Sequence, residues 1–203
     1  MPSIRSLMPE RIEEARRRLV GIIRATPLIG SETLDRIVGA HILLKPENLQ
    51  KTGSFKLRGA YNRLMTLTDE QKSRGVVAAS AGNHGQALAY AATRAGVSAT
   101  IVMPTTAAIA KIDATRSYGQ TVVLEGVDYQ EARAAATKMC IERGASFIDA
   151  YDDEYVIAGQ GTIGMEIADE VTPDVVIVPV GGGGLIAGIA AALARAPNAE
   201  VIG

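Results

Sequence analysis

Tryptophan is absent from the 203 residues, and cysteine, histidine and phenylalanine are rare, with one, two and two copies. The single cysteine, Cys140, has no partner for an internal disulfide, which indicates a reducing compartment, the cytoplasm. The two histidines, His41 and His84, are far apart in sequence and show no metal-ligand spacing, so we expect no metal site. Because 21 Lys and Arg balance 22 Asp and Glu, the strongly basic surface typical of nucleic-acid-binding proteins is excluded.

Long hydrophobic runs are also missing. No segment approaches the ~20 consecutive apolar residues that a membrane-spanning helix needs. The N-terminal segment "MPSIRSLMPERIEEARRRL" is highly charged and lacks the apolar region of a secretory signal. Its Pro9 and the spacing of its apolar residues predict an amphipathic helix that starts at this proline. We therefore expect neither export nor a membrane partner.

Short β-branched runs alternate with longer alanine-rich segments of helical period. This alternation is typical of an α/β protein with parallel, twisted sheets flanked by helices. The expected strands are 41–45, 76–80, 98–103, 121–125, 146–148, 175–180 and 200–203. The expected helices are 54–67, 83–95, 108–118, 129–143, 156–170 and 185–196.

A run of four glycines, Gly181–Gly184, follows an apolar strand that we expect to be buried and precedes an apolar helix. Glycines leave backbone N–H groups free to converge at a helix N-terminus, where a phosphate dianion binds well. A flexible turn is the structural alternative, although such a turn needs only one or two glycines. We interpret the run as a phosphate site.

A second junction between strand and helix keeps polar side chains, in the segment Ser80–Gly85. Ser80 and the nearby N–H groups suit a carboxylate, and Asn83 suits a ring substituent. The structural alternative is N-capping, because Ser and Asn are favoured cap residues. A lone histidine at a helix start, such as His84, is more often structural than catalytic.

Lys56 is placed where a lysine is unfavourable, two residues after Ser54, which we expect to cap a helix. The positive end of a helix dipole disfavours an ammonium group and so favours the neutral amine. A neutral lysine amine forms Schiff bases with carbonyl compounds, including pyridoxal phosphate. A solvated helix lysine is the alternative. An amine, a phosphate site and a carboxylate site together are what a pyridoxal phosphate enzyme acting on amino acids requires.

Four ordered motifs also carry a resemblance to a known family. The segments "KPENLQKTGSFKLRGAYNRL", "SAGNHGQALAYAA", "VIAGQGTIGMEI" and "PVGGGGLIAGIA" resemble the fold type II pyridoxal phosphate enzymes, and within them the threonine dehydratase (threonine ammonia-lyase) and serine racemase group. The similarity runs from about Arg11 to Gly203. It implies a fold like that of the tryptophan synthase β subunit. It also implies a larger pyridoxal-phosphate-binding domain of residues 1–66 and 154–203, incomplete at its C-terminus, and a smaller α/β domain of residues 67–153.

The resemblance assigns roles to individual residues. It implies that Lys56 forms the internal aldimine, that Asn83 contacts the 3-hydroxyl of the cofactor, and that the glycine run with the Leu185 amide binds its phosphate. The implied cofactor-binding residues are Lys56, Phe55, Asn83, Gly181, Gly182, Gly183, Gly184 and Leu185. The implied substrate-binding residues are Ser80, Ala81, Gly82, Asn83 and His84. No residue is assigned to a metal.

The activity implied is β-elimination from L-threonine, and from L-serine, to 2-oxobutanoate or pyruvate plus ammonia, with Lys56 removing the α-proton. A serine racemase-like enzyme is the nearest alternative. Racemases of this group carry a second acid/base on a serine, and the corresponding residue here is Ala81, which has no group that can carry a proton. The resemblance further implies a cytoplasmic homo-oligomer, a dimer or tetramer, that acts on a small amino acid.

Two readings from other classes stay open. The residues Gly182, Gly184 and Ala187 fit the permissive G-x-G-x-x-G/A spacing of a nucleotide-binding module, with Glu200 as a ribose partner. Alternatively, the chain is a catalytically inactive fragment, because similar enzymes continue beyond the strand "EVIG" and place a serine, threonine or cysteine against the pyridine nitrogen. For a fragment we expect exposed apolar surface on the strands 175–180 and 200–203.

Overall fold

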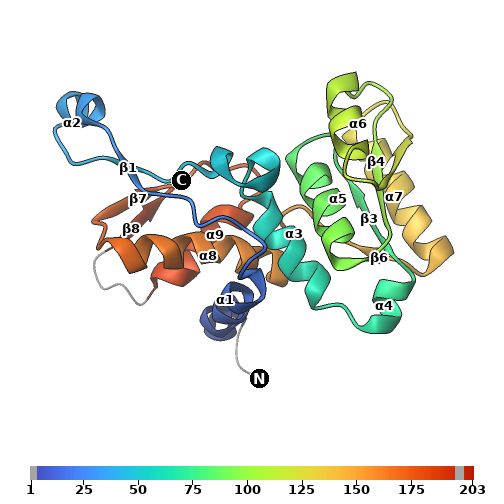
Figure 1. Ribbon diagram of the computed structural model, residues 1–203, viewed down its shortest axis with the longest axis horizontal. Helices are drawn as coiled ribbons and strands as arrows, with labels where there is room; N and C mark the ends of the chain where they lie inside the picture. Colours follow the sequence, from blue (N-terminus) through green and yellow to red (C-terminus); the bar gives the residue numbers. More distant parts are fainter. Residues whose placement is uncertain (1–3, 195–198) are drawn as a thin grey trace.

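The computed structural model describes residues 4–194 and 199–203. Figure 1 shows an elongated arrangement in which one sheet with its helices lies at one end, α8, α9 and β7 lie at the other, and α3 lies between. The helices are α1 (Ile4–Leu19), α2 (Glu32–Val38), α3 (Lys56–Met65), α4 (Asp69–Ser73), α5 (Asn83–Ala95), α6 (Ile109–Arg116), α7 (Tyr129–Arg143), α8 (Glu154–Glu170) and α9 (Gly184–Leu193), with short 3₁₀ helices η1 (Glu47–Leu49) and η2 (Lys51–Gly53). The strands are β1 (Ile29–Gly30), β2 (Leu43–Leu44), β3 (Val76–Ala79), β4 (Ala99–Met103), β5 (Thr121–Leu124), β6 (Ser146–Phe147), β7 (Val175–Ile177) and β8 (Glu200–Ile202).

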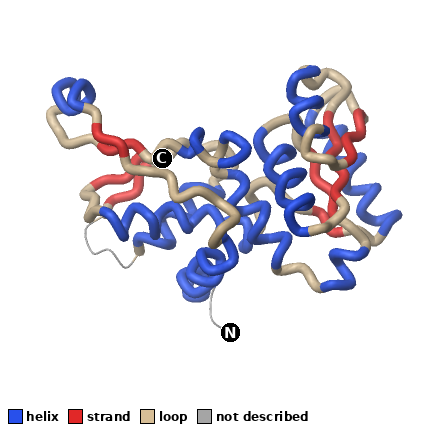
Figure 2. Tube along the Cα trace, viewed as in Figure 1, coloured by secondary structure: helices blue, strands red, loops and turns tan. Residues whose placement is uncertain are grey.

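The largest sheet has four parallel strands in the order β5-β4-β3-β6. Figure 2 shows this sheet in red at one end of the molecule, with helices in blue around it. Successive side chains of β3 point to opposite faces, so Val76 and Ala78 pack with α5 while Val77 and Ala79 pack with α7. All four are buried, as expected for a parallel strand covered on both faces. The prediction of an α/β fold with a parallel sheet flanked by helices is confirmed.

The parallel pair β7–β8 is covered by α8 and α9 on one face only. Val178, after the end of β7, packs against these helices, whereas Ile177 is 79% exposed and Val175 is also exposed. The expectation of a buried strand over 175–180 is therefore wrong, because strand alternation leaves every second side chain on the uncovered face. The expected exposed apolar surface on these strands is present.

Several elements differ from the sequence predictions. The strands β1 and β2 pair antiparallel, unlike the others. Pro9 lies inside α1 and not at its start, and the predicted end of the last helix at Ala196 lies outside the described residues. The helices α2 and α4 were not predicted, although both carry start signals: Ser31 caps α2, and Thr68 forms a capping box with Gln71 in α4.

Helix α3 packs against both α5 and α8, and its side chains Leu57, Ala60 and Leu64 share one hydrophobic core with β3. It is thus the element that connects the two ends of the molecule (Figure 1). The division into residues 1–66 with 154–203 and residues 67–153 stays a prediction. Among the described residues, no helix is long and apolar enough to cross a bilayer.

Glycines allow α8 to approach its neighbours closely. A Cβ added at Gly159 would lie 2.6 Å from both Arg58 O and Gly59 Cα in α3. On the side of α9, a Cβ added at Gly161 would lie 2.9 Å from Gly188 O. These contacts involve backbone atoms, which move only with their helices. The "AGQGTIG" segment therefore sets the distance at which α3 and α9 pack on α8.

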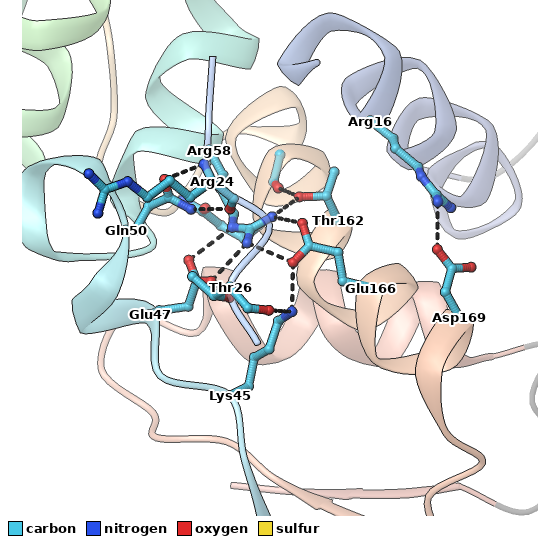
Figure 3. A network of polar contacts seen from close by, with 12 residues as sticks. Arg16, Arg24, Thr26, Lys45, Glu47, Gln50, Arg58, Thr162, Glu166 and Asp169 are labelled. Atoms are coloured by element: carbon cyan, nitrogen blue, oxygen red, sulfur yellow. Dashed lines mark hydrogen bonds and ion pairs between the residues drawn. The ribbon is translucent and has the colours of Figure 1, made fainter. Parts of the chain in front are cut away.

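Arg58, in the first turn of α3, is fully buried and lies at the centre of a polar network (Figure 3). Its guanidinium binds Glu47 through Nε at 2.9 Å and Nη2 at 2.8 Å, and it binds Glu166 through Nη2 at 2.9 Å and also through Nη1. Nη1 also donates to Thr162 Oγ1 at 3.1 Å. Lys45 Nζ lies 2.8 Å from Glu166 Oε2, so two positive and two negative charges balance. The network holds α3 to η1 and α8.

We expect Arg58→Met to destabilise the fold strongly, because it leaves the half-buried carboxylates of Glu47 and Glu166 without their main partner. Breaking a buried ion pair in this way typically costs about 3–5 kcal/mol. The free energy of unfolding, measured by urea denaturation, tests this. Arg16→Met is the matched control, since Arg16 pairs with Asp169 at the exposed surface and such pairs contribute about 1 kcal/mol or less. Equal losses in the two variants would contradict a structural role for the network.

We expect Gly159→Ala to lower the free energy of unfolding as well. The added methyl overlaps backbone atoms of α3, and overpacking of this kind costs about 1–3 kcal/mol. That cost opposes the ~1 kcal/mol gain in helix propensity from glycine to alanine. Gly30→Ala is the control, because its Cβ would meet only Leu43 Cδ2 at 3.9 Å. A Gly159→Ala variant as stable as the parent would show that α3 and α8 can separate freely.

Candidate active site

Lys56 is the first residue of α3. The residue before it, Phe55, makes no side-chain capping hydrogen bond. Ser54, which the sequence predicted as the cap, is extended and buried, and its hydroxyl has no hydrogen-bond partner among the described residues. The capping prediction for Ser54 is therefore wrong, because α3 begins at Lys56 with Phe55 in the cap position, and the Ser54 hydroxyl bonds to no N–H of its first turn.

The Lys56 amine is half-buried. Its Nζ donates to Ala150 O at 2.6 Å and lies 5.3 Å from the centroid of the Phe55 ring. Burial lowers the pKa of Lys56, and the Asp149 carboxylate opposes this effect. The direction agrees with the prediction of a more neutral amine, and burial is its main cause.

The segment Ser80–Gly82 joins the carboxyl end of β3 to the first residue of α5, Asn83. Ser80 is buried and its Oγ accepts a hydrogen bond from Gly82 N at 3.2 Å. Neither Ser80 nor Asn83 caps α5, so the capping alternative does not hold. The Asn83 side chain is exposed and Ala81 is half-buried. The turn thus presents the uncapped N-terminus of α5, a favourable place for an anion.

His84 is the most buried side chain of this turn, with 4% of its surface exposed. Its Nε2 donates to Ile148 O at 3.0 Å, and its Nδ1 has no hydrogen-bond partner among the described residues. Burial lowers the pKa of His84 to about 4, against the opposing effect of the bond to Ile148, and the nearby Lys56 amine lowers it further. The imidazole is therefore neutral at neutral pH and has one free acceptor nitrogen.

The glycine run joins the segment after β7 to α9, which begins at Gly184. Gly183 has φ +85°, a conformation that favours glycine. A Cβ at Gly182 would lie 2.3 Å from the Tyr151 ring, and one at Gly184 would lie 2.8 Å from Tyr151 O. A Cβ at Gly181 would meet nothing within 4 Å, so space is open there. Gly182 and Gly184 are thus packed against Tyr151, whereas Gly181 and Gly183 have open space beside them.

The backbone amides of residues 181–185 find no hydrogen-bond acceptor within the part of the chain that the structure describes. The first turn of α9 also has no side-chain cap. Free amides at a helix N-terminus, with open space beside them, suit a phosphate dianion. The Leu185 amide lies in this first turn, as the resemblance implied.

The segment Ile148–Tyr151, which follows β6, touches all three parts of the site. Ile148 O binds His84, Ala150 O binds Lys56, and Tyr151 packs on Gly182 and Gly184. Because β6 runs parallel to β3, its carboxyl end lies at the same edge of the sheet as the Ser80–Gly82 turn. The motifs predicted from the sequence, at Lys56, Ser80 and the glycine run, did not include this segment. The available signal was the polar "DAYDD" directly after a predicted strand.

Asp149 is a buried carboxylate at the centre of this segment. Its Oδ1 accepts from Tyr151 N and Asp152 N, each at 3.1 Å, and its Oδ2 accepts from Arg133 Nη2 at 2.8 Å. Burial alone would raise the pKa of Asp149, but the bonds from Asp152, Tyr151 and Arg133 outweigh it and hold this pKa below its usual value. The carboxylate is therefore charged.

These residues fit pyridoxal phosphate. A partly buried amine stands ready for an aldehyde, free amides with open space stand ready for a phosphate, and the uncapped turn of α5 suits a carboxylate. Two buried polar atoms of the same segments, Ser54 Oγ and His84 Nδ1, also lack protein partners among the described residues. A nucleotide fits less well, because Glu200 pairs with Val175 at the amino end of β7, away from the glycine run. In the described ranges 4–194 and 199–203, no group of His, Cys, Asp or Glu is placed to hold a metal.

Comparison with known proteins agrees with this geometry. The chain is 51% identical to an L-threonine ammonia-lyase of Thermotoga maritima over 197 residues, which are 96% of this chain and 49% of the relative. The structure of a threonine deaminase isoform from Solanum lycopersicum matches with a TM-score of 0.92 and 40% identity, over 97% of this chain and 55% of that one. Maize serine racemase matches with a TM-score of 0.92 and 37% identity, over 95% of this chain and 59% of that one.

The chain spans about half the length of the curated relatives it matches. The structural matches confirm the fold type II architecture that the resemblance implied. The family described as "Pyridoxal-phosphate dependent enzyme" matches residues 19–203. The chain therefore belongs to the family of pyridoxal-phosphate-dependent enzymes.

Proposed function

We propose that this chain carries the cofactor site and the substrate-carboxylate site of a lyase that eliminates the β-hydroxyl of L-threonine, and of L-serine. The net reaction removes the α-proton and the hydroxyl as water, and hydrolysis then gives 2-oxobutanoate or pyruvate and ammonia. The observation that carries the proposal is the segment Ile148–Tyr151, which brings the Lys56 amine, the turn at His84 and the glycine run to one edge of the sheet. The names of the Thermotoga and tomato relatives support the choice of threonine.

Each site residue has a role in this proposal. Lys56 holds the cofactor aldehyde and then takes the α-proton, since a lysine with a lowered pKa is a competent base near neutral pH. Ala150 O is the acceptor that holds the resulting ammonium in place. When bound, pyridoxal phosphate withdraws electrons from the substrate α-carbon and so makes loss of its proton possible.

The remaining residues bind and orient. The amides of Gly181–Gly184 and Leu185 hold the phosphate, and the exposed amide side chain of Asn83 is free to contact the ring hydroxyl. Phe55 lies beside the Lys56 amine. The substrate carboxylate lies at the N-terminus of α5, held by the turn of Ser80, Ala81, Gly82, Asn83 and His84.

Ala81 distinguishes this function from racemisation. A racemase needs a second proton carrier on the face of the α-carbon opposite the lysine. The likeness to maize serine racemase keeps that activity as the second candidate. Ala81 lies in the turn at the start of α5 and carries only a methyl group. Elimination, which needs one base for the α-proton, is therefore favoured.

By the resemblance to the threonine dehydratase and serine racemase group, we propose that the enzyme works as a cytoplasmic homo-oligomer.

We expect Lys56→Ala to abolish covalent attachment of pyridoxal phosphate. The chain is incubated with the cofactor and reduced with borohydride, and the labelled lysine is located by peptide mass mapping. The parent should carry one label at Lys56, and the variant none. Formation of 2-oxobutanoate from threonine should fall by at least ~10²-fold, the usual contribution of a positioned base.

The matched control for this experiment is Lys138→Ala, which removes a lysine whose side chain is exposed on α7. This variant should label and react as the parent does. Label spread over several exposed lysines of the parent, or threonine deamination by Lys56→Ala at the parent rate, would refute the proposed function.

We expect the stability of the fold to depend on His84 between about pH 4 and 6.5. The folded protein binds a proton on His84 only near pH 4, whereas the unfolded chain binds it near 6.5. The unfolded state binds more protons in this window, so the free energy of unfolding falls as the pH falls. The contribution of neutral His84 is fully present above pH 6.5, and its loss at lower pH amounts to at most about 3 kcal/mol. His84→Gln, which keeps a donor for Ile148 O, should flatten the pH dependence of the free energy of unfolding in this window. An unchanged slope in His84→Gln would show that His84 is not buried neutral.

A further inference from the structure

Within the described part of the chain, Asp149 makes no hydrogen bond to a substrate-binding residue of the proposed site, yet its bonds hold the segment that does. The carboxylate accepts two backbone N–H groups that follow it, from Tyr151 and Asp152, and one N–H of Arg133 in α7. Three hydrogen bonds, two on Oδ1 and one on Oδ2, leave a short buried carboxylate little freedom to move. The turn around Asp149 is therefore set by the carboxylate itself.

The two peptide carbonyls that flank Asp149 both face the site. Ile148 O binds His84 Nε2 at 3.0 Å, and Ala150 O binds Lys56 Nζ at 2.6 Å. A rotation of the turn would break both bonds at once, because the two carbonyls belong to the residues on either side of Asp149. The same turn places Tyr151 on the glycine run. One carboxylate thus sets the position of the acceptor for the lysine amine.

The charges around Lys56 have alternating sign. Asp149 is the anion that acts on the Lys56 amine, and Arg133 is the cation that pairs with that anion, at 2.8 Å. Arg133 also lies over the Phe147 ring, 5.1 Å from its centroid, and is partly exposed. His84, the remaining titratable group beside Lys56, is neutral. Asp149 therefore stabilises the charged form of the Lys56 amine, and Arg133 weakens this effect by pairing with Asp149.

We propose that Asp149 is a positioning residue for the Lys56 amine: it fixes the turn whose Ala150 carbonyl binds that amine, and it keeps one negative charge beside it. The inference rests on the proposed function in that Lys56 is the reactive amine. It adds that the protonation of this amine is set by the opposed effects of burial and the Asp149 charge. Arg133 pairs with the Asp149 carboxylate and so reduces the effect of its charge on the amine.

The experiment measures the ionisation of Lys56 in the chain prepared without pyridoxal phosphate. Acetic anhydride labels neutral amines, and peptide mass mapping gives the labelling rate of Lys56 as a function of pH. We expect Asp149→Asn, which can still accept the two N–H bonds, to move the midpoint of this profile to lower pH. As a fraction of its plateau, the rate at neutral pH should rise at least about threefold, because loss of a nearby anion destabilises the ammonium.

Two further variants keep the test decisive. Arg133→Gln leaves the Asp149 charge unshielded and should move the midpoint to higher pH. Asp152→Asn makes the same chemical change on an exposed neighbour and should leave it in place. If Asp149 were only a structural support, Asp149→Asn would expose Lys56 and move its midpoint upward, toward that of an ordinary lysine. An upward shift, no shift, or an equal shift in Asp152→Asn overturns the proposal.

This readout is independent of the proposed function. Opposite shifts in Asp149→Asn and Arg133→Gln support the positioning role even if borohydride reduction finds no cofactor on Lys56. Conversely, cofactor attached to Lys56 together with an unmoved midpoint in Asp149→Asn would keep the proposed function and refute the role of Asp149.

Discussion

The buried guanidinium of Arg58 is the interaction on which the site depends. Its five N–H groups make five hydrogen bonds, to Glu47, Glu166 and Thr162, so no donor is left unpaired inside the protein. Residues two apart on a helix point to nearly opposite sides, because each residue turns by about 100°. The first turn of α3 is therefore anchored by Arg58 toward α8 while it presents Lys56 on the other side, toward Ala150. The amine is placed by a network that it does not belong to.

A second constraint acts from the side of α8. Asp153 caps this helix and also accepts a hydrogen bond from Arg63 Nε of α3 at 2.7 Å. The N-terminus of α8 is therefore attached to α3. The turn at Asp149 lies between the end of β6 and this fixed helix start, and both of its ends are tied. Close packing at Gly159 fixes the distance between α3 and α8. Since Lys56 and Ala150 come from these two sides, the same packing sets the distance between the amine and its acceptor.

The sequence was informative wherever side chains carry the signal. The bounds of α5 and α7 agree with the predicted ranges, and Lys56, the Ser80 turn and the glycine run were all predicted and meet near one edge of the sheet. The segment at Asp149 was missed because it contacts Lys56 and His84 through two backbone carbonyls, which every residue has, and its only mark in the sequence is the polar "DAYDD" after the strand. Ser54 was predicted as a cap from its residue type alone, but α3 begins at Lys56, so Phe55 takes the cap position. The strand at 175–180 was predicted to be buried because its residues are apolar. The prediction failed because apolar residues are buried only where a neighbouring element covers them.

The amine of a lysine that both attaches a cofactor and moves a proton must be neutral at one moment and charged at another. Burial alone would favour only the neutral form, and an unshielded carboxylate would favour only the charged one. The structure sets these effects against each other around Lys56: burial lowers its pKa, Asp149 raises it, and Arg133 weakens Asp149 by pairing with it. His84 adds no charge, because its own burial keeps it neutral. A base is most effective when its pKa lies near the working pH, and the net effect on Lys56 is a pKa below its usual value, which is a shift in that direction.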